Sequence, residues 1–424
     1  MNIYPESAPG KGSLRCIAAL LLLLLAVSIA EGAGEARTLA LEECIRLAEE
    51  HHPSLEEARA SLNAQKARLD AVKAGNALTG SLSASTGRQT GSDQSYSTSF
   101  TVTKLLSDSG KNALERRSQG LAIDTASESQ REAVLTVRKG VKDAYYTLLL
   151  NGLKREQAES AVRTYEKHLE KAKGFYEAGA KAKFDVTKAE VDLSNAILNR
   201  IRAENALRIT RVNLNNAMGI PDIPEYVIDE TLLPETYAID LPSALEKAYA
   251  VRPDLQSVKK QVEAAEAAVN LAKKGYYPYL TGNAGYGFGG GDFPLGEGWN
   301  VGAALNVPVF NGLETRYSVE EARASLDVVK AQEQTLLQQV RLEVEEAFSN
   351  LREAEERTVA AQMAVRQAEE NVELATGRYD AGVGNPIEVT DALVSLSNAR
   401  TNYIAALTDA RIARAELEKA TGLR

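Results

Sequence analysis

The chain of 424 residues contains only 2 cysteines and 3 histidines, and this scarcity excludes several kinds of site. Cys16 begins an apolar N-terminal segment; once that segment is removed, Cys44 is left alone and no intramolecular disulfide can form. Cys44 lies among apolar residues at helical spacing, which predicts a small buried hydrophobic residue rather than a reactive thiol. The histidines, at positions 51, 52 and 168, match no metal-binding or nucleophilic motif. We therefore expect no metal site, no cofactor and no enzymatic activity.

Proline and aromatic residues are also scarce. There are 12 prolines, none of them between Pro53 and Pro221, and aromatic residues make up 6 % of the chain. Alanine, leucine, glutamate and valine dominate, which is typical of long helices. Because 44 % of the residues are hydrophobic, disorder is not expected. The net charge of −9 argues against a general nucleic-acid binder, which would show a basic patch or stripe.

Long hydrophobic runs are absent except at the N-terminus. Residues 16–29 are apolar and include six consecutive leucines; Lys11 and Arg15 precede them, and small residues that suit cleavage after Ala30 follow. This pattern predicts a secretory signal peptide over residues 1–30, with the exact cleavage site left open. The alternative, an N-terminal membrane anchor, would need about 20 apolar residues.

The sequence repeats itself. Pro53 and Leu55 recur 200 residues later, and Tyr176 and Gly179 recur 203 residues later. The repetition divides the chain into residues 31–219 and 241–424, joined by a proline-containing linker over residues 220–240. Each half has the same order: a helix interrupted at its proline, two segments of alternating polarity, a very long helix, a glycine-containing turn and a second helix.

The predicted long helices cover about residues 111–176 and 313–379. At ~1.5 Å per residue each spans ~100 Å, which exceeds any globular core. Their apolar residues follow a 3-4-3-4 spacing, at positions 134, 137, 141, 144 and 148 and again at 337, 340, 344, 347 and 351. This spacing predicts a coiled-coil seam. With the returning helices, the two hairpins occupy about residues 110–218 and 312–422.

The segments of alternating polarity lie at about residues 78–105 and 278–310. One face of each carries small or polar residues, and the other carries apolar and aromatic residues such as Tyr96, Phe100 and Tyr286. A length of about ten residues suits a tilted transmembrane β-strand. Half-buried strands of a soluble sheet are the alternative, but serine and glycine at every second position fit a water-filled lumen better.

Four such strands cannot close a barrel by themselves. Unpaired strand edges are not tolerated in lipid, so several copies of the chain must contribute. Two copies would give eight strands and an interior that side chains nearly fill, whereas three copies would give twelve strands and room for a pore.

The duplicated plan resembles the TolC family of outer-membrane efflux channels over nearly the whole mature chain. The most specific residues are Tyr-Asp-Ala-Gly at 379–382 followed by Pro-Ile-Glu-Val-Thr-Asp-Ala at 386–392, with a weaker copy at 176–179 and 184–187. Residues 307–312 and 108–110 resemble the family's strand-to-helix exits. No single motif is decisive, but their duplicated order is specific.

The resemblance implies a mainly α-helical fold with a transmembrane β-barrel. Three identical chains would form a twelve-stranded barrel in the bacterial outer membrane, on a twelve-helix coiled-coil tunnel that crosses the periplasm. The protein would be a passive conduit of a tripartite efflux or type I secretion system, with a periplasmic adaptor protein and an inner-membrane pump or ABC transporter as partners. No motif identifies the exported substrate. Two alternatives without a pore, a periplasmic adaptor and a structural coiled-coil envelope protein, fit the matched halves less well.

The resemblance also assigns roles to the hairpin tips. In the family the glycine turns form the periplasmic entrance and dock the adaptor, and the corresponding residues here are Gly179, Ala180, Gly382, Val383 and Gly384.

Four residues beside the tips match the family's entrance. Glu388 and Asp391 share one helical face and match pore-facing acids, so that three copies would form two acidic rings favouring cations. The alternative is that they stabilise the helix dipole. Asp185 matches a family acid, and Tyr379 matches a tyrosine of the closed-state gate.

The sequence departs from the family at two gate positions. The best-known member has a threonine at the position of Phe184 and an arginine at that of Gly384, so the usual gate links are not assumed here.

Four aromatic residues near the predicted strand ends suit the interfacial girdle of a barrel. They are Tyr277, Tyr279, Phe293 and Trp299. Packing in a soluble core is the alternative.

Overall fold

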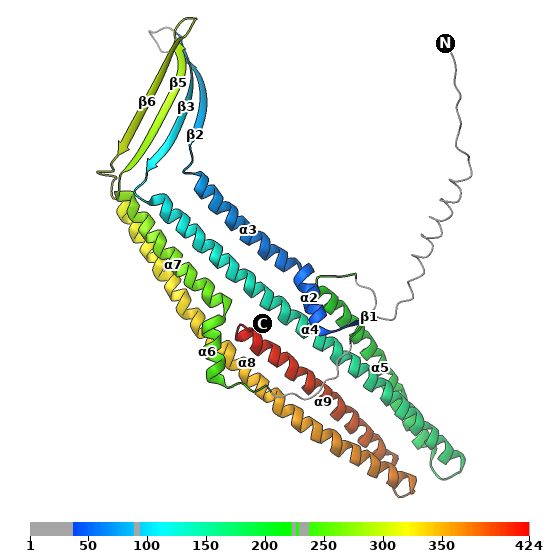
Figure 1. The fold of residues 1–424 in the computed structure, drawn as a ribbon. Helices are drawn as coiled ribbons and strands as arrows, with labels where there is room; N and C mark the ends of the chain where they lie inside the picture. The colour runs from blue at the N-terminus through cyan, green and yellow to red at the C-terminus, as the bar shows by residue number, and fades with distance from the viewer. Residues whose placement is uncertain (1–36, 89–93, 223–225, 229–236, 424) are drawn as a thin grey trace, which may run out of the picture.

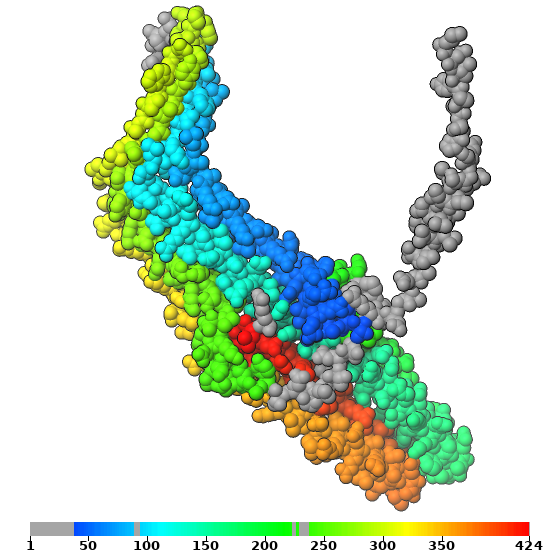
Figure 2. Space-filling model, in the orientation of Figure 1, coloured from blue at the N-terminus to red at the C-terminus, as the bar shows by residue number. Residues whose placement is uncertain are grey.

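A computed structural model describes residues 37–88, 94–222, 226–228 and 237–423. The predicted signal peptide lies outside the described residues, as do parts of the predicted linker. The chain is elongated, with a β-sheet at one end and the tips of two helical hairpins at the other (Figure 1). Figure 2 shows that the molecule is narrow at the sheet and broader in the middle, where the short helices lie beside the long ones.

Helices form most of the molecule. The long helices α4 (Lys111–Glu177) and α8 (Glu314–Asp380) have 67 residues each, and the returning helices α5 (Lys183–Ala217) and α9 (Pro386–Ala420) have 35 each. A pair of shorter helices precedes each strand pair and is broken at a proline; these are α2 (Leu41–His51), α3 (Pro53–Ala74), α6 (Leu241–Val251) and α7 (Pro253–Lys273), with the short 3-10 helix η1 (Lys274–Tyr276) after α7. The mainly helical fold expected from the composition is confirmed.

The predicted coiled-coil seam is buried at its central positions. Val141 on α4 and Val340 and Val344 on α8 are fully buried. The short helices and the ends of the returning helices pack on these positions and form one hydrophobic cluster in each half of the chain. Cys44 is buried in the first cluster, and burial together with the Glu43 charge raises its thiol pKa to about 11. Cys44 is therefore a packing residue, as expected.

The main sheet has four antiparallel strands in the order β2-β3-β5-β6. They are β2 (Thr79–Gly87), β3 (Ser95–Ser107), β5 (Tyr279–Gly290) and β6 (Gly296–Asn306), and a separate parallel pair is formed by β1 (Arg37–Leu39) and β4 (Tyr226–Ile228). The register aligns like residues across all four strands: Leu82, Phe100, Tyr286 and Trp299 form one row, and Ser83, Ser99, Gly287 and Gly298 form the next. The sheet thus has an apolar face and a polar face.

The two halves of the chain lie side by side, and their strands and helices follow one another in a fixed order across the molecule. β3 pairs with β5, and α4 packs against α7 and α9 as well as against α3 and α5. The order is α3-α4-α7-α8 next to the sheet and α5-α4-α9-α8 towards the tips. One side of the chain therefore ends in β2, α3 and α5, which we name the first edge, and the other side ends in β6 and α8, which we name the second edge.

The end of each returning helix packs on the proline break of its own half. Gly219 and Gly422 both have a φ of +72° there, and a Cβ on Gly219 would lie 2.7 Å from the Cα of His52. A Cβ on Gly422 would lie 3.1 Å from the Cα of Arg252. Only glycine combines this backbone conformation with so close an approach.

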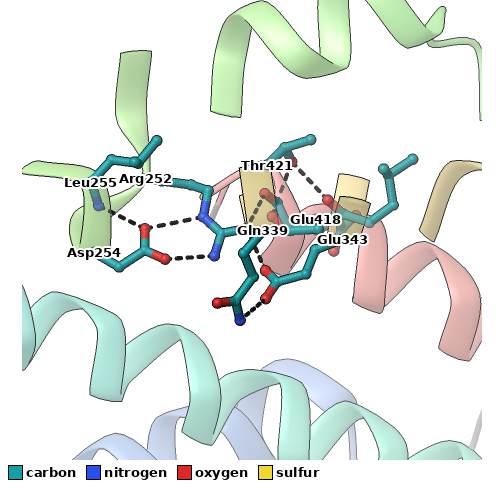
Figure 3. Close-up of polar contacts among 9 residues, drawn as sticks. Arg252, Asp254, Leu255, Gln339, Glu343, Glu418 and Thr421 are labelled. Atoms are coloured by element: carbon teal, nitrogen blue, oxygen red, sulfur yellow. Dashed lines mark hydrogen bonds and ion pairs between the residues drawn. The ribbon is translucent and has the colours of Figure 1, made fainter. Parts of the chain in front are cut away.

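Ion pairs of Arg252 stabilise the second of these junctions. The Arg252 guanidinium, which is buried, donates to both carboxylate oxygens of Asp254 at 3.0 and 2.6 Å and to Glu343 Oε2 at 2.7 Å, and it reaches the Ala420 carbonyl at 3.2 Å (Figure 3). In the first half, His52 accepts a hydrogen bond from the backbone of Ser54 at 3.2 Å instead. The two repeats thus share a backbone plan but stabilise it with different side chains.

Candidate functional site: the hairpin tips

Both hairpins turn at a glycine in the left-handed region. Gly179 has a φ of +71° and Gly382 a φ of +75°. In the first turn, the Gly179 N–H donates to the Tyr176 carbonyl and the Ala180 N–H to the Phe175 carbonyl, both at 2.9 Å. The Schellman pattern of bonds satisfies the last carbonyls of the long helix and reverses the chain.

The second turn is closed in the same way. The Gly382 N–H donates to the Tyr379 carbonyl at 3.0 Å and the Val383 N–H to the Arg378 carbonyl at 3.1 Å. A Cβ on Gly384 would lie 2.7 Å from the Tyr379 backbone nitrogen. No side chain fits at Gly384 without a shift of the turn, so the arginine of the best-known family member has no room at this position.

Tyr379 is the central contact between the two hairpins. Its side chain is 1 % exposed, and its ring lies 5.6 Å from the ring of Phe175 and 5.8 Å from that of His168, both on α4. The Lys181 ammonium lies 4.9 Å from the ring centroid. The hydroxyl is buried and has no hydrogen-bond partner among the described residues. Burial raises the pKa of this phenol, and the charges of Asp185 and Asp380 raise it further.

Polar links surround this aromatic contact. Lys171 on α4 lies 2.9 Å from Asp380 Oδ2, and the Lys181 ammonium donates to the Gly384 carbonyl at 3.4 Å. Deeper in the packing, the Thr390 hydroxyl donates to the buried Asp192 carboxylate at 3.0 Å. Each link joins the first hairpin to the second within one chain.

The acids predicted at the entrance occupy two different environments. Asp185 is buried in the first turn of α5, and no hydrogen bond or ion pair joins it to Tyr379 within the described part of the chain. Glu388 and Asp391 are exposed at the start of α9, where Asn385 caps the helix by accepting from the Ile387 N–H at 2.9 Å. Glu388 lies 3.3 Å from Arg378 Nε. The first two turns of α9 therefore present two carboxylates to solvent.

Sequence reasoning missed His168, Asp192 and the tip lysines. His168 is buried, and burial lowers its imidazole pKa. Tyr165, His168 and Ala172 continue the 3-4 spacing of the α4 seam, which was the available signal. Their contacts with the second hairpin depend on how far α4 is shifted along its axis relative to α8. No local sequence pattern predicts this shift.

The four candidate girdle residues are all exposed in the single chain. Tyr277 and Tyr279 lie at the helical end of the sheet, where the Lys274 ammonium lies 4.7 Å from the Tyr277 ring. Phe293 lies in the loop between β5 and β6, and its ring is 5.3 Å from that of Tyr96. Trp299 pairs with Tyr286 inside the sheet.

Two features are absent from the described residues. No helix in these ranges is both long and apolar enough to cross a membrane. No group of three or more His, Cys, Asp or Glu side chains there is arranged to hold a metal ion.

The fold is that of known outer-membrane channels. CusC matches with a TM-score of 0.80 at 17 % identity over 94 % of this chain and 96 % of CusC. A membrane protein of Pseudomonas aeruginosa matches with a TM-score of 0.79 at 20 % identity, covering 90 % of this chain and 93 % of that protein.

The sequence family agrees with the fold. A family model described as "outer membrane efflux protein" matches residues 44–220 and again 244–423, so the chain belongs to the outer membrane efflux protein family. The resemblance to the TolC family is thereby confirmed.

Curated relatives are more distant in sequence. The probable efflux pump outer membrane protein TtgC of Pseudomonas putida is 24 % identical over 310 residues, which is 70 % of this chain and 63 % of TtgC. The outer membrane protein TolC of Vibrio cholerae is 26 % identical over 323 residues, which is 70 % of this chain and 73 % of that TolC. The chain thus aligns with somewhat less than two thirds of TtgC.

Proposed function

We propose that this protein is the passive outer-membrane channel of a tripartite efflux or type I secretion system. It receives substrates from an inner-membrane pump or ABC transporter through a periplasmic adaptor and releases them outside the cell. The protein performs no catalysis, because the pump supplies the energy. Membership of the efflux family and the architecture of sheet and long hairpins support this function over an adaptor or a structural coiled coil.

One observation carries the proposal: the sheet and the helices are unpaired along the same two edges. Every residue of β2 and of β6 is exposed in the single chain, and each of these strands has one partner among the described strands. Open strand edges cannot persist in lipid. Joining the first edge of each copy to the second edge of the next removes all of them at once.

Three copies give the proposed homotrimer. It has a twelve-stranded barrel, whose apolar face meets outer-membrane lipid and whose polar face lines a pore. Beneath the barrel, twelve helices form a tunnel of ~100 Å, the length of a 67-residue helix at ~1.5 Å per residue. Tyr277, Tyr279, Phe293 and Trp299 form the interfacial girdle.

The hairpin tips form the periplasmic entrance in this proposal. Glu388 and Asp391 form two acidic rings, and the tip turns around Gly179 and Gly382 dock the adaptor. Tyr379 and Asp185 belong to the closed gate. The links of Lys171 to Asp380 and of Lys181 to the Gly384 carbonyl replace those of the arginine that the best-known family member has.

We also propose how the chain is divided. Residues 1–30 direct export and are removed, residues 31–219 and 241–424 are the two efflux repeats, and residues 220–240 link them around the middle of the tunnel.

Electron microscopy of the protein extracted in detergent tests this function. We expect hollow particles with three-fold symmetry, each a short barrel on a tube of ~100 Å, and conductance steps when they are added to a planar bilayer. Monomers or solid rods obtained without detergent contradict the channel and favour an adaptor or a structural coiled coil.

A further inference from the structure

A cavity of about 1010 Å³ lies where the sheet stands on the helices. Its wall is formed by the last turns of α3 and α7, the first turns of α4 and α8, and the helical ends of β3 and β5, all from one chain (Figure 1). Both strand-to-helix exits singled out in the sequence contribute to it, through Asp108 in the first and through Pro308 and Asn311 in the second. Cavities that bind small organic molecules usually measure about 300–1000 Å³, so this one has room for such a ligand.

The strand register places the cavity on the polar face of the sheet. Because side chains alternate along a strand, Tyr279 and Thr281 share the polar face with Gly287. Leu105 pairs with Thr281, and the Asn306 amide donates to the Tyr279 hydroxyl at 2.5 Å. Leu105 and Tyr279 both line the cavity. In the proposed barrel the polar face lines the pore, so the cavity opens to the pore and not to lipid.

Part of the wall is apolar and aromatic. It consists of Leu105 and the rings of Tyr277 and Tyr279, both of which are about half exposed, at 52 % and 43 %. On the pore side these two tyrosines serve the cavity instead of the lipid girdle, to which Phe293 and Trp299 remain assigned. Aromatic rings of this kind hold a flat apolar molecule by stacking.

Four charged side chains in the wall have no ion-pair partner. Lys111 and Glu115 come from the start of α4, Lys274 from η1 and Glu314 from the start of α8. Within the described ranges no oppositely charged group lies within 4.0 Å of any of the four. The cavity therefore presents two cations and two anions that a ligand can engage.

Asn112 adds an acceptor without a donor. Its side chain lines the cavity and is 7 % exposed, and its amide oxygen is buried with no hydrogen-bond partner in the described part of the chain. Asp108, the remaining acid of the wall, is occupied instead, because it accepts from the backbone N–H groups of Gly110 and Asn112 at 3.0 and 2.6 Å. Buried acceptors are normally paired, and a ligand that donates a hydrogen bond would satisfy Asn112.

The barrel wall beyond the cavity is uncharged on its pore side. Lys104 and Glu297 are the two charged residues of the four described strands, and both lie on the apolar face, paired with Gly282 and Phe288. The polar face carries serine, threonine, asparagine and glycine almost throughout. A molecule that leaves the tunnel for the barrel therefore meets its last charged partners at the cavity.

We propose that this cavity is a transit site for small zwitterionic molecules with a flat apolar body. Lys111 and Lys274 hold the acidic group of the ligand, Glu115, Glu314 and Asn112 hold its amine, and the tyrosine rings flank the body between them. The site presupposes the proposed channel and adds a class of substrate to it. A zwitterion suits the wall better than a simple ion, because it pairs with both sets of charges at once.

Binding of norfloxacin to the full chain in detergent tests the site. Norfloxacin is a fluorescent zwitterion with a flat aromatic body, and its fluorescence anisotropy rises when it binds a large particle. We expect saturable binding with a Kd of ~10–1000 µM, because a conduit must release what it binds. Lys111→Gln with Lys274→Gln should weaken binding by at least about tenfold, as should Glu115→Gln with Glu314→Gln.

The matched control is Arg117→Gln with Lys273→Gln. Both residues are exposed near the same helix ends but do not line the cavity, and their loss changes the net charge as the lysine variant does. Norfloxacin should bind this control as it binds wild type. Asn112→Leu, which has nearly the same volume, should weaken binding several-fold because the amine of the ligand loses its acceptor.

The methyl ester of norfloxacin, which lacks the acidic group, tests which charges pair. It should bind wild type at least about tenfold more weakly than norfloxacin does, and the lysine variant should weaken it no further. An equal additional loss for the ester and for the zwitterion in the lysine variant would overturn the proposed pairing.

Current recordings place the site in the pore. Norfloxacin added to a planar bilayer should interrupt the current through wild-type channels, and about tenfold less often through the lysine variant. Displacement of norfloxacin by phosphatidylethanolamine, a zwitterion with long acyl chains, would put the cavity on the lipid side and overturn a pore-side site. Channels that conduct but bind norfloxacin equally in the lysine variant and the control, or not at all, overturn the site and leave the channel standing. Absence of conducting three-copy particles overturns both.

Discussion

The hairpin tips can be held together by the hydroxyl of Tyr379 or by the packing of its ring, and replacing Tyr379 by phenylalanine distinguishes the two. The hydroxyl is buried and has no partner among the described residues, whereas the ring contacts Phe175, His168 and Lys181. Resemblance to the family assigns Tyr379 to the gate; if its hydroxyl made the gate link, removing that hydroxyl would loosen the tips. The geometry predicts the opposite, because Tyr379→Phe removes only an unsatisfied polar atom.

The expected magnitude follows from burial. An unpaired buried hydroxyl costs about 1–3 kcal/mol, so Tyr379→Phe should stabilise the contact between the hairpins by about 1 kcal/mol, or about fivefold in the opening equilibrium. Tyr379→Ala removes the whole ring from a site that is 1 % exposed and should cost about 3–5 kcal/mol. The two substitutions at one position are therefore expected to act in opposite directions.

Hydrogen exchange of the backbone amides of residues 375–392 in detergent measures this opening directly. Exchange should be slower than wild type in Tyr379→Phe and much faster in Tyr379→Ala. Tyr176→Phe is the matched control, because Tyr176 holds the equivalent position in the first hairpin but is 46 % exposed. It should change nothing. Faster exchange in Tyr379→Phe than in wild type would refute the reasoning, since it would mean that the hydroxyl holds the tips together.

Three further predictions follow from the same structure. Glu388→Gln with Asp391→Asn should lower the preference for K⁺ over Cl⁻ in bilayer reversal potentials, and an unchanged ratio would contradict a pore-facing position. Arg252→Met leaves the carboxylates of Asp254 and Glu343 without their guanidinium and should lower the free energy of unfolding by about 2 kcal/mol in chemical denaturation, whereas His52→Ala at the equivalent junction should change it far less. Burial lowers the pKa of His168, against the opposing charge of Asp192 and with the help of Lys171 and Lys188. The stabilising effect of a neutral His168 is complete above the unfolded pKa of about 6.5 and is lost as the pH falls through the lower folded value. The tip amides should therefore lose protection, relative to their intrinsic exchange rates, on acidification in wild type but not in His168→Phe.

The regular parts of the fold could be predicted because they depend on local periodicity. The 3-4 spacing around Val141 and Val344 marks helices that bury one stripe, and the structure buries these positions. The alternation from Ser95 onwards indicates strands with two unlike faces, and the observed register aligns those faces across four strands. In both cases a residue's neighbours in sequence are enough to identify its environment.

The links at the tips and at the junctions could not be predicted, because they join residues far apart in the chain. Lys171 and Asp380 are separated by 209 positions, and Thr390 and Asp192 by 198. The sequence of neither segment shows how far α4 and α8 are shifted relative to each other along their axes. The environment of Arg252 could be predicted in part, since Pro253 and Asp254 indicate the start of a helix. Its bond to Glu343 could not, because it depends on the packing of a helix 91 residues away.

The pairing of β3 with β5 has a consequence for the order of folding. Ser97 pairs with Gly289, so β3 gains its second partner only when a segment nearly two hundred residues later has been synthesised and exported. Until then β2 and β3 form a two-stranded hairpin with an open edge, which is marginally stable in water and prone to pair with other chains. The first helical hairpin, by contrast, is built from local contacts and can form early. In the newly exported chain the first helical hairpin is therefore folded before the four-stranded sheet is complete. The chain needs protection from aggregation until its last strand has paired.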